Sequence, residues 1–135
     1  MFGPFIQSAY EPLLVREQLR AAALMYVQRA LNLKLTVNIL GTNVVIPIIS
    51  EVLRSEGAST VLIDMCVNRG IGGLTNLLIP AIKAIAEQYG YTSLNDLKNL
   101  DDLEVIKAII MQNTDPRIVQ RTQNIIDAGL SFGKA

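Results

Sequence analysis

Residues 61–74 read VLIDMCVNRGIGGL, and this stretch decides the fold. Apolar side chains fill most of it, as in a buried helix, but Asp64 and Asn68 lie four positions apart and would share one helix face. A carboxylate and an amide buried without partners would cost several kcal/mol. The two side chains are therefore expected either to satisfy each other or to line a wet site. Gly70 is expected to end this helix with a positive φ, which glycine adopts without strain.

The flanking sequence predicts further helices joined by short polar turns. Residues 31–40 alternate apolar and polar side chains as a strand does, but no second strand is evident, so they are interpreted as a helix end and connector. The sequence thus predicts an all-α fold of about six helices. The expected helices run from Leu13 to Leu31, from Thr42 or Asn43 to Glu56, from Ser59 or Thr60 to Gly70, from Thr75 or Asn76 to Tyr89, from Leu103 to Asn113, and from Pro116 to Gly129.

Length and composition indicate one domain over residues 1–135, with an N-terminal arm at 1–10 and a C-terminal tail at 130–135. Twelve basic and twelve acidic residues cancel, which argues against a nucleic acid or an anionic membrane surface as partner. The N-terminus lacks the pattern of a signal peptide, and no apolar stretch is long enough to predict a membrane span.

The chain has no histidine and a single cysteine, Cys66. This composition excludes an internal disulfide, Cys-His and Ser-His catalysis, and the common zinc sites, and we expect neither a metal nor a cofactor. Cys66 is expected to be buried and unreactive. Any catalysis would therefore run on carboxylates, for which the candidates are Glu11, Glu17 and Asp64. Only Asp64 lies in surroundings that would perturb it.

Residues 61–74 resemble the central-helix segment of lysozyme-superfamily glycan hydrolases, in which an apolar helix closes with an Asn, a Gly and a small-residue turn beside the sugar cleft. The wider layout is similar to the chitosanase-like and phage muramidase branches, with Gln18 and Tyr26 upstream and a late arginine helix before a glycine-rich end. The resemblance implies a lysozyme-like helical lobe that binds or cleaves an amino-sugar polymer of cell walls. Asp64, Asn68 and Arg69 would contact the glycan.

The early catalytic Glu segment of that superfamily has no counterpart in this chain. The resemblance therefore implies a protein derived from a hydrolase, phage-encoded and inactive alone, unless an upstream or partner chain supplies the acid. It would act in a virion or in the host cytoplasm.

The alternative function is that of a structural or assembly protein of a virion or another large complex, without catalytic activity. The apolar N-terminal arm and the glycine-rich tail are suited to docking on another chain or on a second copy of this one. An arginine pair spaced four apart near the C-terminus could contact an anionic group on a neighbour or on a glycan. The candidate partner-binding residues are Phe2, Phe5, Ile6, Arg117, Arg121 and Phe132.

Overall fold

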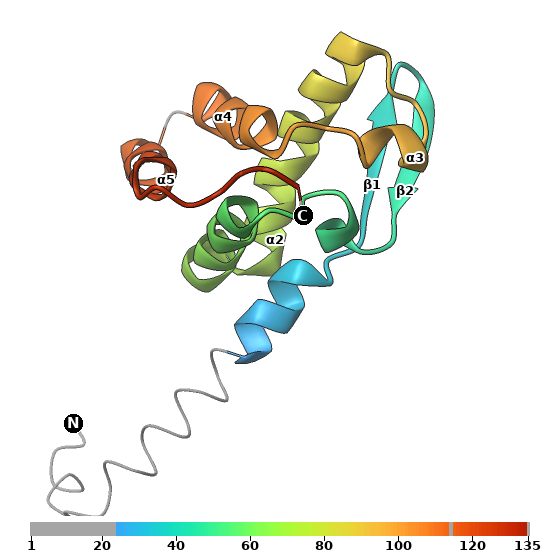
Figure 1. The fold of residues 1–135 in the computed structure, drawn as a ribbon. Helices are drawn as coiled ribbons and strands as arrows, with labels where there is room; N and C mark the ends of the chain where they lie inside the picture. The colour runs from blue at the N-terminus through green and yellow to red at the C-terminus, as the bar shows by residue number, and fades with distance from the viewer. Residues whose placement is uncertain (1–23, 114, 135) are drawn as a thin grey trace, which may run out of the picture.

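A two-stranded hairpin precedes most of the helices in the computed structural model, which describes residues 24–113 and 115–134 (Figure 1). Residues 24–31 are helical, and strands β1 (Leu35–Ile39) and β2 (Thr42–Ile46) then pair antiparallel. The turn residues Leu40 and Gly41 have φ values of 51° and 85°. Positive φ at both positions is typical of a two-residue type I′ turn, whose twist matches that of the strands it joins.

The hairpin corrects the expected all-α fold: the chain is mostly helical but includes a small sheet. The alternation in residues 31–40 is that of a strand, with Leu35, Val37 and Ile39 buried and the intervening side chains exposed. The predicted helix that begins at Thr42 or Asn43 is wrong, because β2 and the 3-10 turn η2 (Ile49–Glu51) occupy that segment. Thr and Asn are good helix caps, and their presence concealed the second strand.

Helix α2 (Glu56–Tyr89) covers the two helices predicted between Ser59 and Tyr89, and it consists of two helical segments that meet at Gly70. The Ser55 hydroxyl caps it by accepting a hydrogen bond from the Ala58 N–H at 3.1 Å, and Gly90 ends it with φ 74°. Gly70 has φ 76° and ψ 175°, so its predicted positive φ is confirmed. The chain turns at this residue and continues as helix, so Gly70 divides α2 into two segments. Within the described ranges, no helix has the length and apolar character needed to cross a membrane.

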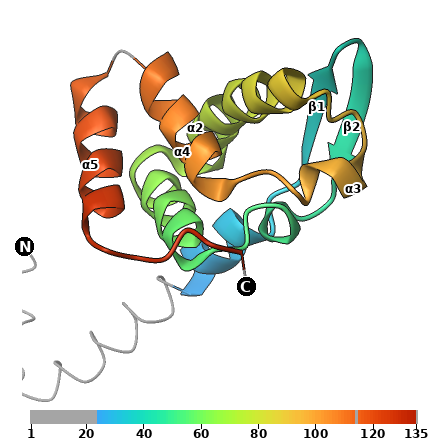
Figure 2. The same cartoon turned by 45° about the horizontal axis from the view of Figure 1, so that its top comes forward.

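Three further helices complete the described chain: α3 (Leu94–Leu97), α4 (Asp102–Gln112) and α5 (Pro116–Asp127). α4 begins one residue before its predicted start at Leu103, and α5 begins at its predicted start, Pro116. Asp101 accepts the Leu103 N–H at 3.0 Å, and Asp115 accepts the Arg117 N–H at 2.9 Å. α4 packs along α2, and α5 contacts both α2 and α4 (Figure 2).

One hydrophobic core joins the hairpin to the helices. Its largest fully buried side chains come from β1, β2, η2, α2, α3, α4 and the loops between them: Ile39, Ile46, Ile49, Leu53, Leu62, Leu74, Leu78, Ile82, Leu97, Leu100, Ile106 and Ile109. Polar contacts hold the hairpin tip to the second segment of α2. Lys83 Nζ donates to the Asn38 carbonyl at 2.9 Å, and the Leu40 N–H donates to Glu87 Oε2 at 3.0 Å.

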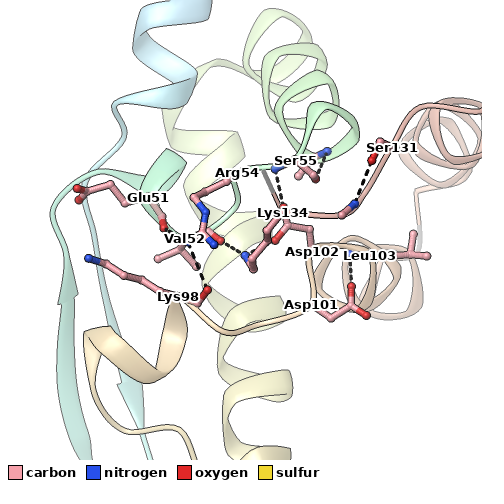
Figure 3. Close-up of polar contacts among 12 residues, drawn as sticks. Glu51, Val52, Arg54, Ser55, Lys98, Asp101, Asp102, Leu103, Ser131 and Lys134 are labelled. Carbon is pink, nitrogen blue, oxygen red and sulfur yellow. Dashed lines mark hydrogen bonds and ion pairs between the residues drawn. The ribbon is translucent and has the colours of Figure 1, made fainter.

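The C-terminal tail folds back onto the start of α2 and is fixed there by a buried carboxylate (Figure 3). Asp102 is completely buried and accepts hydrogen bonds from the Ser55 N–H, at 2.8 Å, and from Lys134 Nζ. Lys134 also donates to the Val52 carbonyl. A buried charge is tolerated only when it is paired and hydrogen-bonded, and this cluster meets both conditions.

A second contact of the tail lies at Gly57, next to the same cluster. The Gly57 N–H donates to the Ser131 carbonyl at 2.8 Å. A Cβ atom at residue 57 would lie 2.5 Å from ring atoms of Phe132, so the ring packs directly on the glycine. The aromatic side chain of the tail is thus partly buried against its own chain.

Candidate functional site

A cleft of about 500 Å³ lies between the middle of α2 and helix α5. Its lining residues are Asn68, Arg69 and Gly73 from α2 and Arg117, Ile118 and Arg121 from α5. A smaller hollow of about 20 Å³ adjoins it and adds Asp64 to the same face. The cleft is therefore lined by two of the three residues expected to contact a glycan, Asn68 and Arg69, and by both arginines expected to contact a partner, while Asp64 lines only the adjoining hollow.

The break at Gly70 shapes the α2 side of this cleft. Gly70 itself has open space around it, but its φ of 76° is one that other residues rarely adopt. Gly73 follows in the second segment of α2, where a Cβ would lie 2.6 Å from the Cβ of Arg69. The backbone turn thus brings Gly73 against Arg69, and a larger residue at 73 would displace the arginine that lines the cleft.

Asp64 forms the centre of a polar group that spans the two helices. Arg121 Nη2 donates to its Oδ1 at 2.5 Å, and Arg121 Nε donates to its Oδ2 at 3.2 Å. Asn68 Nδ2 donates to the Asp64 carbonyl at 2.7 Å and to Oδ1 at 3.3 Å. The prediction that Asp64 and Asn68 lie within reach of each other is confirmed. Hydrogen bonding to the carboxylate raises the pKa of Arg121.

A second interhelical ion pair lies beside the first. Arg69 Nη2 contacts Asp115 Oδ2 at 2.6 Å, while Arg117 Nε lies 3.5 Å from Asp115 Oδ1. The backbone N–H of Arg117, donating to the carboxylate, is the largest cause that lowers the pKa of Asp115, and the charges of the two arginines lower it further. Asp115 is therefore ionised at neutral pH, and it both caps α5 and positions Arg69.

Sequence reasoning found Asp64 and the two arginines of α5, but it missed Asp115 as the partner of Arg69 and the pairing of Asp64 with Arg121. The partner of Arg121 is Asp64 on α2, and not a residue of its own helix. The arginines could be found from the sequence because Arg117 and Arg121 are four apart and therefore lie on one face of α5.

Of the remaining predicted site residues, only Phe132 is among those that the structure describes, and it does not line the cleft. Glu11 and Glu17, the other catalytic candidates, lie outside the described residues, as do Phe2, Phe5 and Ile6. Phe132 packs on Gly57 of its own chain.

Cys66 is buried as expected, with 1% of its surface exposed. Burial raises the pKa of its thiol, although the positive charge of Arg29 opposes this effect. Low reactivity towards thiol reagents stays a prediction, because a protonated thiol is a poor nucleophile.

Comparisons of the chain with protein-family models, with curated proteins and with solved structures found no match.

Proposed function

We propose that this protein is a lysozyme-like glycan-binding protein that uses the cleft between α2 and α5 to bind an amino-sugar polymer. The observation that carries the proposal is the cleft itself, in which Asn68 and Arg69 stand beside the paired Asp64 and Arg121. Amide and guanidinium groups in a concave site are suited to hydroxyl and acetamido groups, which both donate and accept hydrogen bonds.

The same geometry supports binding without cleavage. Glycoside hydrolysis needs a carboxylic acid that gives a proton to the leaving oxygen and a second carboxylate across the sugar. Both oxygens of Asp64 already accept hydrogen bonds from Arg121. Asp115 has a lowered pKa and is ionised at neutral pH, so it holds no proton to donate. We therefore expect no turnover by the isolated chain.

A titration with the N-acetylated chitotetraose, followed by amide chemical shifts, tests this function. Binding should shift the amides of residues 68–73 and 117–121, and Asn68→Ala and Arg121→Ala should each weaken it by about fivefold or more. Lys107→Ala serves as the control, because Lys107 is exposed on α4 and does not line the cleft. Absence of shifts at the cleft would overturn glycan binding. Release of reducing sugar by the purified chain would overturn the inactive assignment.

A second candidate function, a structural role in an assembly, is favoured by one observation. Leu24, Met25 and Tyr26 are consecutive on a helix and expose 55%, 58% and 37% of their surfaces. Several large apolar side chains exposed within one helical turn are more than a single scattered residue, and exposed apolar surface of this kind can mark a protein contact site. Light scattering over a concentration series would support this role by showing association that Leu24→Ser together with Met25→Ser abolishes. A monomer at every concentration would argue against self-assembly.

A further inference from the structure

The positive and negative charges of the side chains at the cleft do not cancel. Arg69, Arg117 and Arg121 line it, and only two carboxylates, Asp64 and Asp115, contact them among the described residues. One positive charge is left in excess. A concave surface with an excess of one sign of charge concentrates ions of the opposite sign.

The three arginines differ in how they are held. Asp64 binds Arg121 through two hydrogen bonds, and Asp115 holds Arg69 at 2.6 Å. Arg117 has only the longer contact of 3.5 Å to Asp115, and 88% of its side chain is exposed. Arg117 is therefore the guanidinium that can turn towards a ligand without breaking a strong interaction.

Apolar contacts contribute little to this site. Ile118 is the only large apolar side chain among the described lining residues, and none of them is aromatic. A neutral sugar ring would find no flat surface on which to stack, so most of the affinity must come from polar groups. A planar guanidinium binds a carboxylate or a phosphate through two parallel hydrogen bonds, which gives both strength and orientation.

We infer that the cleft contains an oxyanion subsite, in which Arg117 binds a carboxylate or phosphate group of the ligand while Asp64 and Asp115 hold Arg121 and Arg69 in place. The inference rests on the proposed function in one respect, namely that a saccharide carries the oxyanion. The ligand class is accordingly an acidic amino-sugar oligomer.

The test compares three probes by amide chemical shifts: neutral N,N′-diacetylchitobiose, the same N-acetylated disaccharide carrying a lactyl carboxylate, and inorganic phosphate. The acidic disaccharide should bind about tenfold more tightly than the neutral one. Arg117→Ala should remove that difference, whereas Arg117→Lys should keep part of it, because an ammonium supplies charge without the two-pronged geometry. Lys107→Ala, which removes one positive charge outside the cleft, should leave the difference unchanged. Thermal unfolding of each variant checks that the fold is intact.

The outcomes separate this inference from the proposed function. Equal binding of the two disaccharides, unaffected by Arg117→Ala, would overturn the oxyanion subsite and leave glycan binding standing. Binding of phosphate, sensitive to Arg117→Ala, without binding of either disaccharide would support the subsite and overturn the glycan function. If none of the three probes binds at the cleft, both the oxyanion subsite and glycan binding are overturned.

Discussion

Arg121 on α5 donates two hydrogen bonds to the carboxylate of Asp64 on α2, at 2.5 and 3.2 Å. The pair joins segments 57 residues apart in the chain and closes one side of the cleft. Asn68 adds a third donor to the same carboxylate. This arrangement is geometrically specific because a guanidinium and a carboxylate are both planar and match in spacing.

Removing either partner of this pair should loosen the contact between α2 and α5. We expect Asp64→Ala to lower Tm by about 2–5 °C, because α5 loses an anchor while most of the Arg121 side chain stays solvated. The double variant Asp64→Ala with Arg121→Ala should lower Tm by less than the sum of the two single changes. Additive effects in this double-mutant cycle, followed by thermal unfolding, would show that the pair does not stabilise the fold.

Gly70 and Gly72 provide a matched test of the break in α2. Gly70→Ala should destabilise the protein by about 1–3 kcal/mol, because alanine rarely adopts a φ of 76° with an extended ψ. Gly72 has open space around it and helical dihedral angles, so Gly72→Ala should be neutral or stabilising by up to about 1 kcal/mol. Urea unfolding of the two variants measures both. Equal effects would show that the break does not depend on glycine at position 70.

The elements that the sequence predicted correctly are those with a strong local cause. Gly70 adopts its predicted positive φ, and α4 and α5 begin within one residue of their predicted starts, because each of these features is decided within a few residues. The hairpin was missed for the complementary reason. A strand is stable only with a partner, and the partner Thr42–Ile46 begins with two residues that also favour a helix start.

The candidate site was predictable only in part. Asp64, Asn68 and Arg69 follow from one short segment, and Arg117 and Arg121 follow from helical spacing. That these two sets meet across one cleft depends on how α5 packs on α2, and no local pattern encodes that packing. The buried role of Asp102 is of the same kind, because its partners Ser55 and Lys134 are 47 and 32 residues away.

Asp102 and its neighbour Asp101 should respond very differently to the same substitution. Asp102→Ala leaves the partly buried Lys134 without its carboxylate and the buried Ser55 N–H without its acceptor, so we expect a loss of about 2–4 kcal/mol. Asp101 is exposed and only caps α4, so Asp101→Ala should cost about 1 kcal/mol. Chemical denaturation of both variants provides the measurement. Similar values would mean that the buried cluster contributes no more than an ordinary cap.

Acid should weaken the attachment of α5 through Asp115. Its pKa is lowered in the folded protein, first by the Arg117 N–H, so its contribution to stability is present above the pKa of an unfolded Asp and is lost as pH falls through the folded value. The loss should therefore begin below about pH 4. In Asp115→Asn this dependence disappears, and the stability of the variant should fall less steeply than that of the unsubstituted protein between neutral pH and pH 2. Urea unfolding of both proteins at a series of pH values measures this. Stability curves that run parallel as pH falls would contradict the role of Asp115.

Because Gly57 contacts Phe132, the effect of Gly57→Ala on stability should depend on whether Phe132 is present. It should be destabilising with the ring and neutral or stabilising without it. Gly57→Ala places a methyl group 2.5 Å from the Phe132 ring, so the ring must move and the C-terminal tail loses its packing on α2. We expect this to destabilise the protein by about 1–3 kcal/mol. In a chain that already carries Phe132→Ala the clash is absent, and the same change should be neutral or stabilising by up to about 1 kcal/mol, because alanine favours the helix over glycine. Hydrogen exchange at the amide of residue 57, which donates to the Ser131 carbonyl, should be accelerated by Gly57→Ala only when Phe132 is present. A penalty for Gly57→Ala that persists without the ring would place its cause in the backbone of α2 and not in the docking of the tail.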